Sequence, residues 1–153
     1  MKAACPPYLD QPMRSNESGD EELRRRVSWI PIKTITDQRG HLVVFEEGTS
    51  LPFAPVRTFV ISQVPPDATR ANHAVSCDLV LVALQGQCTM LARYGNGKGI
   101  YQLVSGGDAL LLRRDTWISL SNFSAATLLL VLASNKFAET KYAVQPTVGQ
   151  PRC

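Results

Sequence analysis

The sequence has no hydrophobic run long enough to cross a membrane. Its longest apolar stretches are Ala109–Leu112 and Ala125–Ala133, well short of the ~20 residues that a membrane-spanning helix needs. The first residues carry a single lysine and no apolar segment of the kind that directs secretion. We therefore expect a cytoplasmic protein without a membrane partner.

Charge of one sign is also scarce. The chain has 16 lysines and arginines against 13 aspartates and glutamates, for a net charge of +3. Nucleic-acid-binding domains concentrate far more positive charge on one face, so no nucleic-acid partner is expected. Hydrophobic residues make up 44% of the 153 residues, which is enough to fill the core of one ordinary domain and excludes wholesale disorder.

Residues that bind metals or form disulfides are few. The chain contains four cysteines and two histidines, namely Cys5, Cys77, Cys88, Cys153, His41 and His73. No C-x-x-C motif occurs, and nothing at the N-terminus indicates export, so we expect reduced thiols. Two histidines exclude a three-histidine metal centre, and no H-x-x-x-H spacing supports a site with two histidines and a carboxylate. We expect neither a metal nor a cofactor.

Two polar ends flank one candidate domain. Residues 1–27 contain three prolines, a polar stretch and charges of both signs that cancel, which is typical of a flexible arm. We expect disorder up to Gly19 and one or two helical turns over Glu21–Arg26 with Asp20 as their cap. The domain itself is expected at 28–143, followed by a short tail at 144–153.

From Trp29 onward the chain consists of short β-rich runs separated by glycine- and proline-containing breakers. The expected strands are Trp29–Ile35, His41–Glu46, Val56–Val64, Arg70–Ala74, Leu79–Leu84, Cys88–Tyr94, Ile100–Val104, Ala109–Leu112, Trp117–Leu120 and Thr127–Ala133. Strands at this regular spacing, with no long helical period between them, predict an all-β sandwich or barrel.

Two details favour a double-sheet roll. Gly95–Gly99 is typical of a hairpin tip between two alternating strands. Leu110–Leu112 and Leu128–Leu132 are apolar on both faces, which suits a sheet that is covered on one side by a partner sheet and on the other by a second subunit. A homodimer is the expected assembly.

Several motifs resemble the sugar 3,4-ketoisomerase family. The most specific is the string D-x-R-G-x-L-x-x-x-E-E-G, which runs from Asp37 to Gly48. In the same order follow Leu51–Phe53, Val56–Ile61, Arg70–Ala74, Leu81–Cys88, Trp117, Phe123, Val131–Ser134 and Glu139–Tyr142. The resemblance covers about residues 29 to 142.

This resemblance implies a cupin-type double-stranded β-helix, or jelly roll, usually a dimer that exchanges N-terminal strands. It implies an isomerase of deoxysugar biosynthesis that moves the ketone of a dTDP-linked 4-keto-6-deoxy sugar from C4 to C3. Such a reaction needs a base at C3, a donor to the enediolate oxygen and a proton returned at C4. A histidine suits the proton transfer, and arginines suit the diphosphate.

The family's functional residues can be carried over at several positions. The resemblance places the first of a pair of catalytic histidines at His73 and a strand arginine that assists it at Arg57. It places substrate-binding residues at Arg39, Gly40, Arg70, Phe59, Val75 and Trp117.

Three of the matched positions depart from the family pattern. Val75 occupies the position of the second histidine, which the family uses as its base, and Phe59 occupies that of a tyrosine. Ile118 replaces a polar residue that commonly follows the tryptophan. Neither valine nor phenylalanine can transfer a proton, so the usual mechanism cannot operate unchanged.

Two functions are therefore open from the sequence. The first is a ketoisomerase with altered or reduced activity, in which another residue, with Cys77 as one candidate, replaces the base. The second is a non-catalytic cupin that binds a nucleotide sugar as a partner subunit or sensor. The sequence leaves enzyme status undecided and gives little support to a third option, a purely structural oligomerisation module.

Overall fold

The computed structural model describes residues 17–146. These form one α-helix, twelve strands and a short 3₁₀ helix. The elements are α1 (Glu17–Arg26), β1 (Val27–Ile30), β2 (Lys33–Asp37), β3 (Gly40–Val44), β4 (Arg57–Ser62), β5 (Arg70–Val75), β6 (Leu79–Gln85), β7 (Gln87–Tyr94), β8 (Gly97–Val104), β9 (Ala109–Leu112), β10 (Trp117–Ser121), β11 (Leu128–Ala133), η1 (Phe137–Glu139) and β12 (Tyr142–Ala143).

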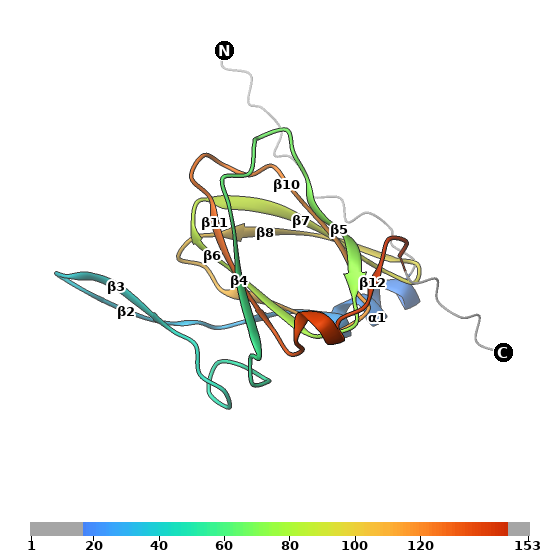
Figure 1. The fold of residues 1–153 in the computed structure, drawn as a ribbon, viewed down its shortest axis with the longest axis horizontal. Helices are drawn as coiled ribbons and strands as arrows, with labels where there is room; N and C mark the ends of the chain where they lie inside the picture. The colour runs from blue at the N-terminus through green and yellow to red at the C-terminus, as the bar shows by residue number, and fades with distance from the viewer. Residues whose placement is uncertain (1–16, 147–153) are drawn as a thin grey trace, which may run out of the picture.

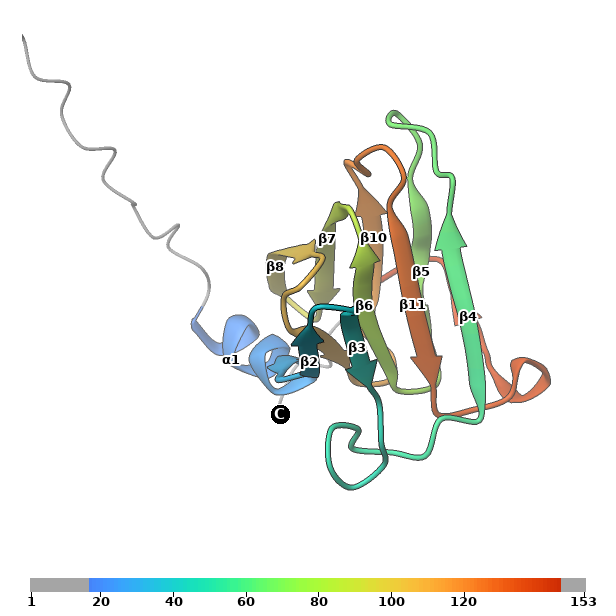
Figure 2. The same cartoon turned by 90° about the vertical axis from the view of Figure 1, so that its left-hand side faces the viewer.

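Ten of the strands form two antiparallel sheets that pack face to face (Figures 1 and 2). The first sheet has the order β1-β9-β6-β11-β4 and the second has the order β12-β5-β10-β7-β8. Strands that are distant in the sequence are thus neighbours in each sheet. The remaining two strands, β2 and β3, pair only with each other. The predicted all-β, double-sheet architecture is confirmed.

Most strand boundaries lie within two residues of those expected from the sequence, but β8 begins at Gly97, three residues before the expected Ile100, so the turn of the predicted hairpin tip is limited to Gly95 and Asn96. Two other differences concern whole strands. The run Trp29–Ile35 is not one strand, because the chain leaves β1 after Ile30 and begins β2 at Lys33. Pro31 lies in this break and has no N–H group to donate to a sheet ladder. The second difference is β12, a two-residue strand that no propensity signal indicated and that depends on pairing with Val75 and Ala74.

The core lies between the two sheets. Alternate residues of each strand point inward, and the largest completely buried side chains are Leu81, Met90, Leu103, Leu110, Leu120 and Leu129. They come from six different strands, three from each sheet. Cys88 is also buried, and burial raises the pKa of its thiol to about 11. This side chain is apolar filling, as expected from the sequence.

The N-terminal part of the described chain belongs to the domain. Helix α1 begins at Glu17, so Asp20 lies within the helix and is not its cap. Leu23 of α1 and Val27 at the start of β1 are both buried in the core. Where an arm was expected, residues 17–27 thus form α1 and the start of β1, whereas residues 1–16 lie outside the described residues.

The outer face of the first sheet is apolar as well. Val80, Val82, Leu111 and Leu132 are buried there, and part of the cover is the segment 45–53, from which Leu51 and Phe53 pack onto the sheet. The rest of the face stays open, with Val60 52% exposed. The hairpin β2–β3 projects away from both sheets (Figure 1), and the side chains of Ile35 and Leu42 on it are exposed.

Three features that the sequence composition bears on are the cysteines, clusters of metal ligands and membrane-spanning helices. Cys77 and Cys88 are free thiols, while Cys5 and Cys153 lie outside the described residues. Within residues 17–146, no three histidines, cysteines or acids cluster as metal ligands would. No helix in this part of the chain is long and apolar enough to span a bilayer.

Replacing Gly86 with alanine should destabilise the fold by about 2–4 kcal/mol. Gly86 is the one residue between β6 and β7 and has φ = +70°, which costs an L-residue ~1 kcal/mol. An added Cβ would lie 2.5 Å from Thr127 Oγ1 and 2.8 Å from Thr127 Cα. Because one of these atoms is backbone, the clash adds ~1–3 kcal/mol. Urea unfolding measures the change.

Gly106→Ala is the matched control. Gly106 has φ = +79°, and nothing lies within 4 Å of an added Cβ. This variant should lose only the ~1 kcal/mol of backbone strain. Equal losses in the two variants would contradict the steric explanation.

Candidate active site

A cavity of about 150 Å³ opens between the edge of the first sheet at β4 and the edge of the second sheet at β12 and β5. Its lining is mostly aliphatic, with polar groups at a few positions. The lining residues are Arg57, Phe59, Ile61, Arg70, Ala71, His73, Val75, Leu79, Leu81, Ile118, Leu120, Val131 and Tyr142. Such a largely apolar pocket with a few convergent polar groups is the usual form of a small-molecule site.

Strand alternation explains why these side chains meet. Arg57, Phe59 and Ile61 are every second residue of β4, so all three face inward. His73 and Val75 share the inward face of β5 in the same way. At the start of β5, Ala71 and Asn72 have positive φ angles of 66° and 58°, and the pairing of β5 with β10 shifts register beside them. This irregularity brings Arg70 onto the cavity as well.

His73 is half-buried, and its Nδ1 atom is buried without a hydrogen-bond partner in the described chain. Burial lowers the pKa of the imidazole below its ordinary value of 6.5, because desolvation disfavours the charged form. The ring is therefore neutral at physiological pH. A neutral imidazole with an unoccupied nitrogen can accept a proton from a bound molecule.

Arg57 carries an uncompensated charge into the cavity. Its Nε and Nη1 atoms are buried and have no hydrogen-bond partner among the described residues. The guanidinium carbon lies 5.4 Å from the ring centroid of Phe59 and 5.8 Å from that of Phe137, so aromatic faces support the cation without using its N–H groups. Arg70 adds a second, exposed cation at the rim, and no acidic residue is among the described residues of the lining.

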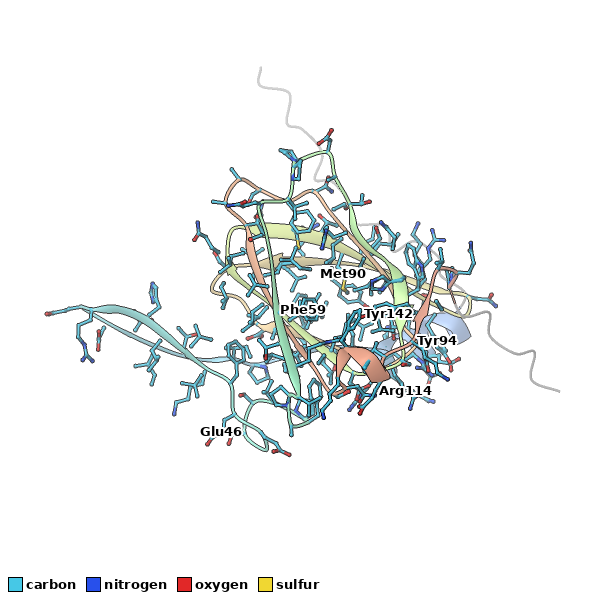
Figure 3. The ribbon with its side chains drawn as sticks, in the orientation of Figure 1. Glu46, Phe59, Met90, Tyr94, Arg114 and Tyr142 are labelled. Atoms are coloured by element: carbon cyan, nitrogen blue, oxygen red, sulfur yellow. The ribbon has the colours of Figure 1, made fainter. Side chains whose placement is uncertain are left out.

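Tyr142 lies beside His73 on the cavity wall. The two ring centroids are 5.1 Å apart, with an interplanar angle of 79°, so one ring meets the other edge-on. Tyr142, which is labelled in Figure 3, belongs to β12. This strand pairs with β5. This tyrosine ends the segment Glu139–Tyr142 that resembles the family, but the resemblance assigns it no role. The feature of the sequence that could have identified it is a proton-carrying phenol within a segment that resembles the family.

Five of the eight predicted site residues line this cavity, and three do not. Arg39 and Gly40 lie at the tip of the β2–β3 hairpin, where Arg39 donates to Asp37 and thereby lowers the pKa of that carboxyl. Neither residue lines the cavity of its own chain, and the hairpin β2–β3 extends away from the two sheets (Figure 1). Trp117 precedes Ile118 on β10, and neighbouring residues of a strand face opposite sides. Ile118 lines the cavity, whereas Trp117 does not, and its Nε1 donates to the Val144 carbonyl oxygen at 2.8 Å.

Cys77 does not line the cavity. Its side chain is 3% exposed and lies 3.9 Å from Thr140 Oγ1. A thiol in this position cannot reach a molecule in the cavity, so the structure gives Cys77 no part in replacing the missing base. The proton-transferring side chains of the described lining are His73 and Tyr142, since an arginine does not give up its proton at physiological pH.

Comparisons with known proteins agree with the resemblance in sequence. The family described as FdtA, WxcM-like, C-terminal matches residues 25–147, more than half of the chain. A relative from Aneurinibacillus thermoaerophilus, named TDP-4-oxo-6-deoxy-alpha-D-glucose-3,4-oxoisomerase, is 33% identical over 117 residues, which are 76% of this chain and 84% of the relative.

Solved structures of similar proteins have the same architecture. A variant of the 3,4-ketoisomerase QdtA from Thermoanaerobacterium thermosaccharolyticum, in complex with TDP-4-keto-6-deoxyglucose, is 29% identical. It matches with a TM-score of 0.74 over 78% of this chain and 88% of its own. The TDP-quinovose 3,4-ketoisomerase WlaRB from Campylobacter jejuni is 27% identical, with a TM-score of 0.73 over 78% of this chain and 92% of its own.

Proposed function

We propose, because the chain belongs to the FdtA family of WxcM-like C-terminal domains, that it isomerises a TDP-linked 4-keto-6-deoxy sugar to the 3-keto sugar. The related oxoisomerase and the QdtA variant carry this chemistry and this ligand in their names. The observation in the chain itself that supports the proposal is the cavity. It holds two cations and one neutral histidine, and no acidic side chain is among its described lining residues.

Three polar groups of the cavity, His73, Arg57 and Arg70, meet demands of the reaction. His73 takes the proton from C3 and returns a proton to C4, which a single neutral base can do in turn. The buried donors of Arg57 stabilise the negative charge that develops on the enediolate oxygens. Arg70, at the exposed rim, binds the diphosphate, whose oxygens match a planar guanidinium.

Nuclear magnetic resonance of the sugar tests the proposal directly. The purified protein is mixed with TDP-4-keto-6-deoxyglucose in heavy water, and TDP binding is measured by calorimetry on the same sample. We expect TDP to bind and the 3-keto isomer to form with exchange of the C3 proton. Binding without exchange would instead support a non-catalytic domain that recognises a nucleotide sugar, and a lack of TDP binding would reject both functions.

The assembly that fits this function is a homodimer of two copies. Within residues 17–146 the hairpin β2–β3 pairs with no other strand, and Ile35 and Leu42 on it are 44% and 58% exposed. The outer face of the first sheet also offers exposed apolar side chains such as Val60. Exchange of the hairpins between copies would bury these surfaces and move Arg39 away from its own cavity toward the other copy.

Light scattering with size-exclusion chromatography checks this assembly. The variant Ile35→Asp should shift the protein toward the monomer, because a carboxylate would be buried in the interface. Ile100→Asp is the control, since Ile100 is 62% exposed on β8, an edge strand of the second sheet. A wild-type protein that runs as a monomer, or two variants with the same mass as wild type, would reject the exchange.

A further inference from the structure

The proposed isomerisation moves two protons, and His73 can account for only one of them. One proton leaves C3 and one arrives at C4. At the oxygens, one proton must leave the C3 hydroxyl and one must arrive at the C4 oxygen. During the first half of the reaction His73 holds the carbon proton, so a second group must serve the oxygens.

The cavity offers few candidates for this second group. Arg57 can stabilise an oxyanion, but an arginine cannot give up its proton in a protein. Phe59 and Val75 occupy the positions where the family resemblance places a tyrosine and a histidine, and neither side chain carries a transferable proton. Among the described lining residues, the group that can both donate and accept a proton, apart from His73, is the hydroxyl of Tyr142.

The position of Tyr142 follows from strand pairing. Tyr142 lies directly opposite Val75 in the antiparallel pair of β12 and β5. Residues opposite each other in such a pair point to the same face of the sheet, and both side chains line the cavity. His73 is two residues from Val75 on that face and meets the ring of Tyr142 edge-on at 5.1 Å. A phenol thus stands beside the site where the second histidine is absent.

From this placement we propose that Tyr142 is a catalytic acid and base for the sugar oxygens in this chain, an inference that rests on the function proposed above. As neutral His73 removes the C3 proton, the Tyr142 hydroxyl protonates the C4 oxygen, which gives an enediol, an imidazolium and a phenolate. The phenolate then takes the proton of the C3 hydroxyl while the imidazolium protonates C4. Both side chains return to their starting state, and no oxidant or reductant is consumed.

The geometry favours the intermediate charge state. An imidazolium and a phenolate whose rings are 5.1 Å apart attract each other strongly in a cavity with aliphatic walls. Burial alone lowers the pKa of His73, so His73 becomes a stronger base only at the moment when Tyr142 gives up its proton. This coupling would let one neutral pair replace the missing histidine and tyrosine.

The variant Tyr142→Phe isolates the hydroxyl, because phenylalanine keeps the ring that packs against His73 and Phe137. We expect kcat for TDP-4-keto-6-deoxyglucose to fall by about 10²–10⁴-fold, with the KM, the TDP affinity and the melting temperature unchanged. Tyr94→Phe is the matched control. Tyr94 stacks with Arg26 outside the cavity, so this variant should keep the wild-type kcat.

The outcomes separate this inference from the function on which it rests. Wild-type turnover with an equal kcat in Tyr142→Phe would overturn the role of Tyr142 and leave the isomerase function in place. A rise in KM or a loss of TDP binding with kcat unchanged would also overturn it, since a wall residue would act in that way. A wild-type protein that binds TDP without turning over the sugar would overturn both.

Discussion

Replacing His73 with asparagine should lower kcat by at least about 10³-fold, the upper part of the range for a general base. His73 is the one imidazole that lines the cavity, and its buried Nδ1 has no partner within residues 17–146. Asparagine retains a polar side chain but cannot take a proton from carbon. The sugar is followed by nuclear magnetic resonance, and TDP binding by calorimetry, where we expect no more than a small change.

His41→Asn is the control for this variant. His41 lies on the exposed hairpin and contacts Thr36 Oγ1 at 2.9 Å, outside the cavity of its own chain. We expect this variant to keep wild-type turnover. If His73→Asn keeps it too, His73 is not the base. If His41→Asn abolishes turnover, the base comes from the hairpin of a second copy.

The same residue sets the expected pH dependence. Burial lowers the pKa of His73 below 6.5, and the reaction needs its neutral form. The value of kcat/KM should therefore be flat at neutral pH and fall on acidification, with a midpoint below 6.5. Protonation also opposes burial, so the free energy of unfolding should decrease as pH falls below 6.5, the value of the unfolded chain. In His73→Asn both acid dependences should weaken.

Replacing Arg57 with methionine should change activity and stability in opposite directions. The buried, unpaired donors of Arg57 are ready to receive developing negative charge, and losing such donors costs about 10²–10³-fold in kcat. Within residues 17–146, however, these buried donors have no hydrogen-bond partner. An unhydrogen-bonded buried donor costs ~1–3 kcal/mol, so a methionine of similar length should raise the free energy of unfolding by ~1 kcal/mol.

Two further arginine variants separate the causes. In Arg70→Met, the loss should appear mainly in the affinity for TDP, because this residue lies at the exposed rim. Arg93 lies 5.8 Å from the ring of Trp117, the same distance as Arg57 from Phe137, but it is exposed on β7. Arg93→Met should therefore leave both kcat and stability near wild type. A less stable Arg57→Met would argue against the uncompensated charge.

Five of the eight residues predicted from the sequence line the cavity, and strand alternation, which is a local property, explains part of this agreement. Once Val56–Ile61 is read as a strand, Arg57 and Phe59 must share a face, and they do. The family resemblance then supplied His73 and Val75 on the opposite sheet. The position of Arg39 could not be predicted in this way. It lies on a hairpin that extends away from both sheets, and strand alternation does not determine where the tip of such a hairpin lies.

The failures have equally specific causes. Trp117 and Ile118 are adjacent, and only the pairing of β10 with β5 and β7 decides which of them faces the cavity. Tyr142 enters the site through a strand of two residues, too short to leave a pattern in the sequence. The buried role of Leu23 in α1 was missed because the surrounding charges suggested a solvated arm.

The lateness of β12 in the chain has a consequence for synthesis. Every strand that contributes the largest buried side chains ends at or before Ala133, whereas Tyr142 follows nine residues later. A nascent chain can therefore assemble its hydrophobic core before the phenol beside His73 is in place. For the same reason, a protein that ends at Thr140 would keep the residues of its hydrophobic core and lack the hydroxyl of Tyr142. Its folding could then be measured separately from its catalytic activity.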